Sequence, residues 1–462
     1  MNRERLLTLW ELIFFGVVLL QSPVAAIPLF GIGQQLSGGH VSTAILIPMF
    51  AMGVTAVSYG RMAALFPSAG SSYTYVAKGL NPFVGFLTGW AIVFDYLLQP
   101  LICTVWVSTA LHNEYLPGVP YAMLAAIVAG AITVLNLRGV KASVRVNQLL
   151  LGWMFIVVGT FIALAARFLY VHQAWHGLLS AKPFYDPDTF NLHRVLAGSS
   201  FAVLTYVGFD AITTLSEDVE NQRRTVLLAT VTICIFNGAF GCFVSYLGQR
   251  VWPDWHSFRS LETAFMEICS RVGGRPLMDA MNATIIVAFF GSGLTCGLGA
   301  AKLLFGMGRD GVLPKRLFGH VAPGTNIPSY NIILLGVLSF GGAVLLNVYG
   351  NAFQHAGELI NFGAFLAFMG VNLATFWQFG VVRRRRGMRF MLVDAAFPLI
   401  GFGFCAIIWW NLSPVAKSVG GAWFVAGLIH LLIITKCFRS ATTPSMSAIR
   451  ERVPPALPLP RE

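Results

Sequence analysis

The sequence predicts an all-α, polytopic membrane protein, and three observations lead to this fold class. Of the 462 residues, 56% are hydrophobic and only 11% are charged, whereas soluble domains carry about 25% charged residues. The apolar residues gather in runs long enough to cross a bilayer, which takes about 20 residues per helix. Lys and Arg concentrate in alternate connections between these runs, as in proteins with several membrane spans. A soluble enzyme of this length is therefore excluded.

Apolar runs of spanning length follow one another along the chain, and we take each as one transmembrane helix. The twelve runs cover residues 12–35, 41–66, 83–111, 121–137, 146–170, 194–217, 225–247, 278–307, 328–348, 356–380, 391–411 and 417–437. The first run is longer than a signal-peptide core and lacks a convincing cleavage site, so we expect it to remain as the first span. Residues 440–462 are rich in proline and polar residues, which predicts a disordered tail.

The basic residues predict the orientation. Of the 31 Lys and Arg residues, 22 fall in segments that are cytoplasmic if the N-terminus is cytoplasmic, and 8 fall in the opposite segments. This bias predicts a multi-pass protein of the plasma (inner) membrane with both termini in the cytoplasm. The net charge of +12 thus follows membrane topology rather than a nucleic-acid partner. The seven cysteines are scattered and form no metal-ligand spacing, so we expect no metal and no cofactor.

Two of the predicted spans, five spans apart, carry an interruption in their middle. The first span is interrupted at Gln21-Ser22-Pro23, and the sixth around Tyr206-Val207-Gly208-Phe209-Asp210. Unwound backbone at membrane depth is tolerated where it lines a cavity, and matched interruptions in two halves of a chain are typical of a transporter substrate site. The alternative for each break alone is a proline kink or a glycine packing contact.

Two carboxylates, Asp95 in the third span and Asp210 in the sixth, lie far from any span end. Each costs about 2.5–3.5 kcal/mol at the centre of the bilayer. Only one basic residue, Lys302, lies within a span, near its cytoplasmic end. A cationic substrate or a bound proton would offset the unpaired negative charge. Alternatively, Asp210 caps the second half of the broken helix, and Asp95 bonds to polar neighbours.

Charged residues near the cytoplasmic ends of spans six and eight form a second candidate site. Glu217 lies close to Arg223 and Arg224, and Arg309 precedes Asp310. Glu217, Arg309 and Asp310 are candidates for a cytoplasmic gate, with a solvated loop of mixed charge as the alternative. The chain offers no clustered nucleophile, base and metal set, and we therefore expect no enzyme activity.

Four motifs, in this order, resemble those of the amino acid, polyamine and organocation (APC) transporter superfamily. They are F-P-S-A-G-S-S-Y-T-Y-V from Phe66, G-F-D-A-I-T-T-L-S-E-D from Gly208, L-L-F-G-M-G-R-D-G-V-L-P from Leu303 and N-F-G-A-F from Asn361. The resemblance implies a leucine-transporter-type fold of five plus five helices in inverted repeats. It divides the chain into a cytoplasmic N-terminus at 1–11, a ten-helix transport core at 12–380, two additional helices at 381–439 and a cytoplasmic tail at 440–462.

The resemblance also implies a substrate site between broken helices one and six, with help from helices three, eight and ten. The D-Y-L-L-Q-P stretch from Asp95 and the G-F-D-A-I-T-T-L-S-E run look most like those of bacterial putrescine importers. Two features depart from relatives that carry α-amino acids or use a lysine in helix five. The first break contains no glycine, and Pro23 offers no N–H to a substrate carboxylate. The run from Val146 to Tyr170 contains no lysine, so proton coupling would rest on Asp95 or Asp210.

These observations predict a secondary transporter that imports a small amine or amino compound by alternating access with protons as the coupling ion. The predicted substrate-binding residues are Gln21, Ser22, Pro23, Asp95, Tyr206, Gly208 and Asp210. Two alternatives remain open at this point. One is a permease or exchanger for neutral amino acids, and the other is a transporter-like sensor that completes no transport cycle.

Overall fold

The computed structural model describes residues 7–66, 71–139, 144–219, 222–309, 313–321, 327–383 and 390–435. Within these ranges the chain is helical, and the only β pairing is an isolated bridge between Leu7 and Val219. The first helix begins at a capping box, in which the Thr8 hydroxyl accepts from the Glu11 N–H and the Glu11 carboxylate accepts from the Thr8 N–H. This cap satisfies two of the free donors at the helix start.

The first half of the chain contains a broken first span and four further long helices. Its elements are α1 Leu9–Leu19, α2 Phe30–Ser37, α3 Val41–Leu65, α4 Ser71–Gly79, α5 Pro82–Glu114, α6 Tyr121–Leu137 and α7 Val144–Leu178. The second half repeats this order from α8 onward. Its elements are α8 Leu192–Ala202, η1 Val203–Thr205, η2 Phe209–Asp218, α9 Gln222–Val251, η3 Trp255–Ser257, α10 Ala264–Arg309, α11 Lys315–Phe318, α12 Ser329–Tyr349 and α13 Ala352–Phe376. The chain ends in η4 Trp377–Val382, η5 Phe390–Ala396, α14 Phe397–Trp410 and α15 Pro414–Ile434.

The described residues contain nine helices long and apolar enough to cross a membrane, or ten when the bent pair 192–205 and 209–216 counts as one span. The protein is therefore a multi-pass membrane protein. Two of the twelve predicted spans fall outside this count. The first, at 12–35, is divided between α1 and α2, and the fourth is the 17-residue helix α6. The count of twelve stays a prediction.

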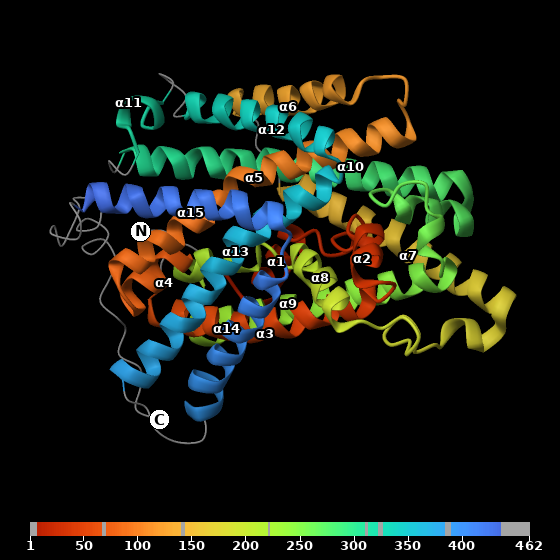
Figure 1. Ribbon diagram of the computed structural model, residues 1–462, viewed down its shortest axis with the longest axis horizontal. Helices are drawn as coiled ribbons and strands as arrows, with labels where there is room; N and C mark the ends of the chain where they lie inside the picture. Colours follow the sequence, from red (N-terminus) through yellow and green to blue (C-terminus); the bar gives the residue numbers. More distant parts are fainter. Residues whose placement is uncertain are drawn as a thin grey trace.

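Helix contacts repeat when both partners are moved five spans along the chain. The α1–α9 contact has its counterpart in α8–α3, the α5–α13 contact in α10–α7, and the α5–α6 contact in α10–α12. Two equivalent halves of five spans would give this pattern. The centre of the molecule is formed by α5 and α13, whose most apolar segments are each 72% buried, while α15 lies at the periphery with 17% buried (Figure 1). The exposed apolar side chains of such peripheral helices suit a lipid environment.

One connection differs from its prediction. The predicted runs at 225–247 and 278–307 leave a long connection between the seventh and eighth spans, yet the structure places helical backbone from Ala264 onward. Phe265, Met266 and Ile268 on this helix are buried, and their burial stabilises it against the core. Gly274, with φ of 69°, then bends the chain into the eighth span just before Pro276.

Candidate functional site

The break in the first span extends from Leu20 to Leu29 and includes the predicted Gln21, Ser22 and Pro23. Gln21 has φ of 49°, a left-handed conformation that is uncommon for residues other than glycine. Its side-chain amide donates a hydrogen bond of 2.8 Å to the Ala288 carbonyl of α10. This bond to α10 offsets part of the strain in the Gln21 backbone.

The break in the sixth span lies between Thr205 and Phe209, and the two helical parts differ in direction by 41°. Gly208 has φ of 105° at this point. Two side-chain amides from other helices bind carbonyls near the break. Asn237 of α9 donates to the Thr205 carbonyl at 2.6 Å, and Asn361 of α13 donates to the Ser200 carbonyl at 2.7 Å. These bonds explain how unwound backbone is tolerated at membrane depth.

A cavity of about 110 Å³ lies between the two breaks and is bordered by α5, α10 and α13. Its polar lining residues are Gln21, Gln99 of α5 and Ser292 of α10. Most of the rest of the wall is apolar and includes Val207 from the second break and Phe353 at the start of α13. A mostly apolar wall with a few convergent polar groups is typical of a small-molecule site.

Of the predicted binding residues only Gln21 lines this cavity, and the two membrane carboxylates each lie three or four residues along the chain from a residue that does. Asp95 is buried one helical turn from Gln99, whose amide donates to its carboxylate at 2.9 Å. Asp210 is three residues beyond Val207 and is also buried. We refer to Asp95 and Asp210, each three or four residues from a residue that lines the cavity, as the acidic floor.

The other predicted binding residues are placed less directly. Ser22 and Pro23 are buried within the first break, and the Ser22 hydroxyl has no hydrogen-bond partner in the described part of the chain. Tyr206 is buried, and its hydroxyl donates to the Ile45 carbonyl of α3 at 2.8 Å. Tyr206 therefore anchors the second break to α3, and only its neighbour Val207 lines the cavity.

The cytoplasmic gate stays a prediction. The Glu217 backbone belongs to η2, but its side chain lies outside the described residues, as does all of Asp310. Arg309 is the exposed last residue of α10.

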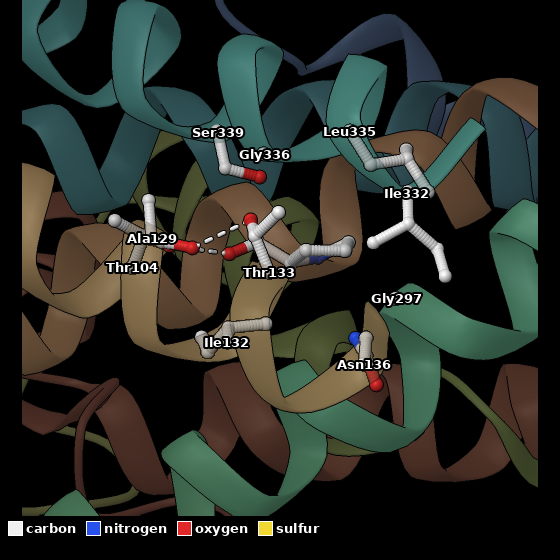
Figure 2. A pocket seen from close by; sticks show the side chains of 11 residues that line it. Thr104, Ala129, Ile132, Thr133, Asn136, Gly297, Ile332, Leu335, Gly336 and Ser339 are labelled. Carbon is white, nitrogen blue, oxygen red and sulfur yellow. Dashed lines mark hydrogen bonds between the residues drawn. The ribbon is translucent and has the colours of Figure 1, made fainter. Parts of the chain in front are cut away.

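A second small cavity lies between α5, α6, α10 and α12. Figure 2 shows Thr133, Asn136 and Ser339 around it. Its volume is about 10 Å³, enough for about one water molecule. The Thr104 and Thr133 hydroxyls donate to carbonyls one turn back in their own helices, at 2.9 and 2.7 Å. This cavity cannot hold an organic substrate.

The sequence prediction missed Gln99, Ser292 and Phe353. Gln99 stands four residues after Asp95 within the D-Y-L-L-Q-P stretch, and this spacing places both side chains on one face of a helix. The spacing was therefore sufficient to find Gln99. Ser292 and Phe353 carry no such local signal, because only the packing of α10 and α13 brings them to the cavity.

The chain is similar in sequence to known transport proteins. A family model described as amino acid permease matches residues 7–435. The low-affinity putrescine importer PlaP of Escherichia coli (strain K12) is 30% identical over 438 residues, which cover 95% of each chain. The branched-chain amino acid permease BcaP of Lactococcus lactis is 24% identical over 86% of this chain and 87% of its own. The vacuolar cationic amino acid transporter 4 of Arabidopsis thaliana is 26% identical over 72% of this chain and 57% of its own.

Proposed function

The chain belongs to the amino acid permease family, a family of transporters rather than enzymes, and on this premise we propose that it imports a small amine. The import proceeds by alternating access between the two sides of the plasma membrane. The similarity to a putrescine importer over nearly the whole chain supports a diamine as substrate. Neutral amino acid transport, suggested by the similarity to branched-chain amino acid permeases, is the competing function.

The observation that carries this proposal is the acidic floor of the cavity. Asp95 and Asp210 are both buried close in sequence to residues that line the cavity, and the described lining contains no Lys, Arg or His. An ammonium group bound between them would neutralise charge that is otherwise costly in the membrane. In this role Asp95, held by Gln99, binds the substrate ammonium. Asp210 serves as the proton carrier or as the partner of a second ammonium group.

The first break supports an amine over an α-amino acid. The N–H groups of Gln21, Ser22 and Val24 each donate to a carbonyl of the same segment, and Pro23 has no N–H. These bonds leave fewer free backbone donors for a substrate carboxylate than an open helix end provides. A substrate without a carboxylate has no need of them.

The proposal includes the topology. We propose twelve spans, with α1 and α2 forming the broken first span and α6 the fourth, and both termini in the cytoplasm. The ten-helix core at 12–380 then contains the substrate site, and the helices at 381–439 lie outside it.

Uptake into liposomes tests the substrate. Purified protein is offered labelled putrescine, arginine and leucine, each with and without an inward proton gradient. We expect saturable putrescine uptake that the gradient stimulates, with leucine transported poorly. Preferred uptake of leucine would establish the neutral amino acid permease instead, and binding without uptake of any of the three would point to a sensor.

Two single substitutions separate the roles of the acidic floor. Asp95→Asn removes the charge that binds the ammonium, and because hydrogen bonds to charged groups contribute about 1.5–3 kcal/mol, we expect KM for putrescine to rise roughly 10- to 100-fold. Asp210→Asn should abolish stimulation by the proton gradient. Asp188→Asn, at an exposed loop position, is the control and should leave uptake unchanged. Acid-stimulated uptake that persists in Asp210→Asn would exclude Asp210 as the proton carrier.

A further inference from the structure

Three aromatic rings from three helices meet at the cavity, next to the start of α13. The Phe353 ring packs against Phe201 of α8 and Phe289 of α10, with ring centroids 6.1 Å apart in both pairs. Phe289 and Phe353 both line the cavity, and Phe201 and Phe353 are almost completely buried. We refer to Phe201, Phe289 and Phe353 as the aromatic roof.

A carboxylate in a loop forms a hydrogen bond with Phe353, whose ring is part of the aromatic roof. Glu262, in the connection between α9 and α10, accepts a hydrogen bond of 3.2 Å from the Phe353 N–H. This N–H belongs to the first turn of α13 and has no acceptor within its own helix. The Thr109 hydroxyl near the end of α5 interacts with the same carboxylate. Glu262 therefore joins the loop to two helices that line the cavity.

The loop is also seated directly on the outer half of the broken first span. Gly31 in α2 lies so close to the Leu261 carbonyl oxygen that a side chain at this position would collide with it. The loop thus contacts α2, α5 and α13. Residues of α5 and α13 line the cavity, and α2 follows Leu29, which also lines it. The end of α5 and the start of α13 face the outside in the orientation proposed above.

We propose that Glu262 holds the aromatic roof closed over the central cavity and must release Phe353 before substrate enters from outside. This inference rests on the proposed function, because it takes the cavity as the substrate site. A carboxylate at a helix N-terminus is favoured by the helix dipole as well as by the hydrogen bond. Loss of the carboxylate therefore shifts the roof toward its open state and leaves the acidic floor intact.

The native Cys103 thiol provides a direct measure of roof opening. Cys103 lines the cavity and is 2% exposed. Intact cells that express the protein are treated with a membrane-impermeant methanethiosulfonate reagent, and modification of the Cys103 peptide is quantified by mass spectrometry. We expect Glu262→Ala to accelerate modification about tenfold, since losing a hydrogen bond to a charged group shifts an equilibrium by at least this factor. Glu262→Gln, which retains an acceptor oxygen, should give a smaller increase.

Two controls make the measurement specific. Cys405, buried against Thr55 between α14 and α3, should show the same low modification in every variant. Glu267→Ala removes a nearby carboxylate that accepts from the Arg259 N–H at 2.9 Å and should leave Cys103 protected. If Glu262→Ala fails to fold, Thr109→Val is tested instead. It removes a hydroxyl that interacts with the Glu262 carboxylate, and it should raise Cys103 modification by less than the tenfold expected for Glu262→Ala.

Unchanged Cys103 modification in a folded Glu262→Ala protein would overturn the inference, whatever the substrate is. Accelerated modification in a protein that transports no amine would overturn the proposed function and leave the role of Glu262 in closing the roof intact. The labelling experiment reports access to the cavity and requires no knowledge of the substrate, so the two failures are distinguishable.

Discussion

Two residues turn the backbone at the breaks, and they do so by different means. Gln21 occupies a left-handed conformation at a cost and is held there by its bond to Ala288. Gly208, with φ of 105°, adopts a conformation that L-residues rarely reach. Its surroundings are open, because an added Cβ would have only the Leu20 side chain nearby, at 4.0 Å. Backbone conformation, and not lack of space, therefore requires glycine at this position.

Gly208→Ala tests this distinction. We expect a loss of about 1–2 kcal/mol, the cost of a left-handed conformation for a residue with a Cβ, and lower uptake because the second break is displaced. The measurements are thermal unfolding of the purified protein and uptake in liposomes. Gly291→Ala is the matched control, since a Cβ at this helical position in α10 meets nothing within 4 Å and should leave stability equal or improved. Equal destabilisation by both substitutions would refute the conformational explanation.

The N-F-G-A-F motif illustrates what a sequence resemblance leaves unexplained. Two of its residues make contacts that explain why these residue types are needed there. Asn361 binds the Ser200 carbonyl beside the second break. Gly363 lets α13 approach α5 so closely that a side chain would collide with the Ala91 carbonyl oxygen. Both contacts involve residues more than 150 positions away, and no local pattern reveals them.

At the scale of elements, a buried ion pair joins α3 to the segment that precedes α14. Arg61 and Asp394 are 2.6 Å apart, and their side chains are 19% and 3% exposed. The Arg61 guanidinium also lies over the Phe379 ring, 4.6 Å from its centroid. Desolvation of both charges offsets most of their attraction, so the pair contributes little compared with an apolar replacement. Removal of one partner leaves the other charge with less compensation in a mostly buried place.

A double-mutant cycle measures this asymmetry. We expect Asp394→Leu or Arg61→Met alone to destabilise the protein by about 3–5 kcal/mol, and the double variant to be less destabilised than either. The readout is the unfolding midpoint of each purified protein in the same detergent. Arg316→Met, on the exposed α11, is the control for loss of a surface charge. Additive losses in the double variant would show that Arg61 and Asp394 do not interact.

Elements with strong local signals were predicted well, and elements that depend on distant partners were not. The predicted run at 121–137 coincides with α6, and the run at 41–66 differs from α3 by one residue, because a spanning helix is encoded in its own apolar residues. The break in the sixth span was also predicted, from glycine and a buried carboxylate in one short stretch. The roles of Glu262 and Asp394 were not, because each charge is explained only by a partner on another element.

At the scale of the whole molecule, the long helices run between two ends that differ in their number of basic residues. One end carries α11 and the last turn of α15, and the opposite end carries the connection between α7 and α8 (Figure 1). Lys315 and Arg316 lie at the first end, and Lys182 lies in the α7–α8 connection. The excess of basic residues at the first end predicts that it faces the cytoplasm.

Cysteine labelling at the two ends decides the orientation. In intact cells, we expect an impermeant maleimide to modify Lys182→Cys, whose native side chain is 76% exposed, and to modify Lys315→Cys only after the membrane is permeabilised. Both positions are exposed, so a difference between them reports sidedness and not burial. The reverse pattern would place the termini outside. It would also invert the route to the cavity, because the aromatic roof would then close the path to the cytoplasm and Glu262 would control release rather than entry.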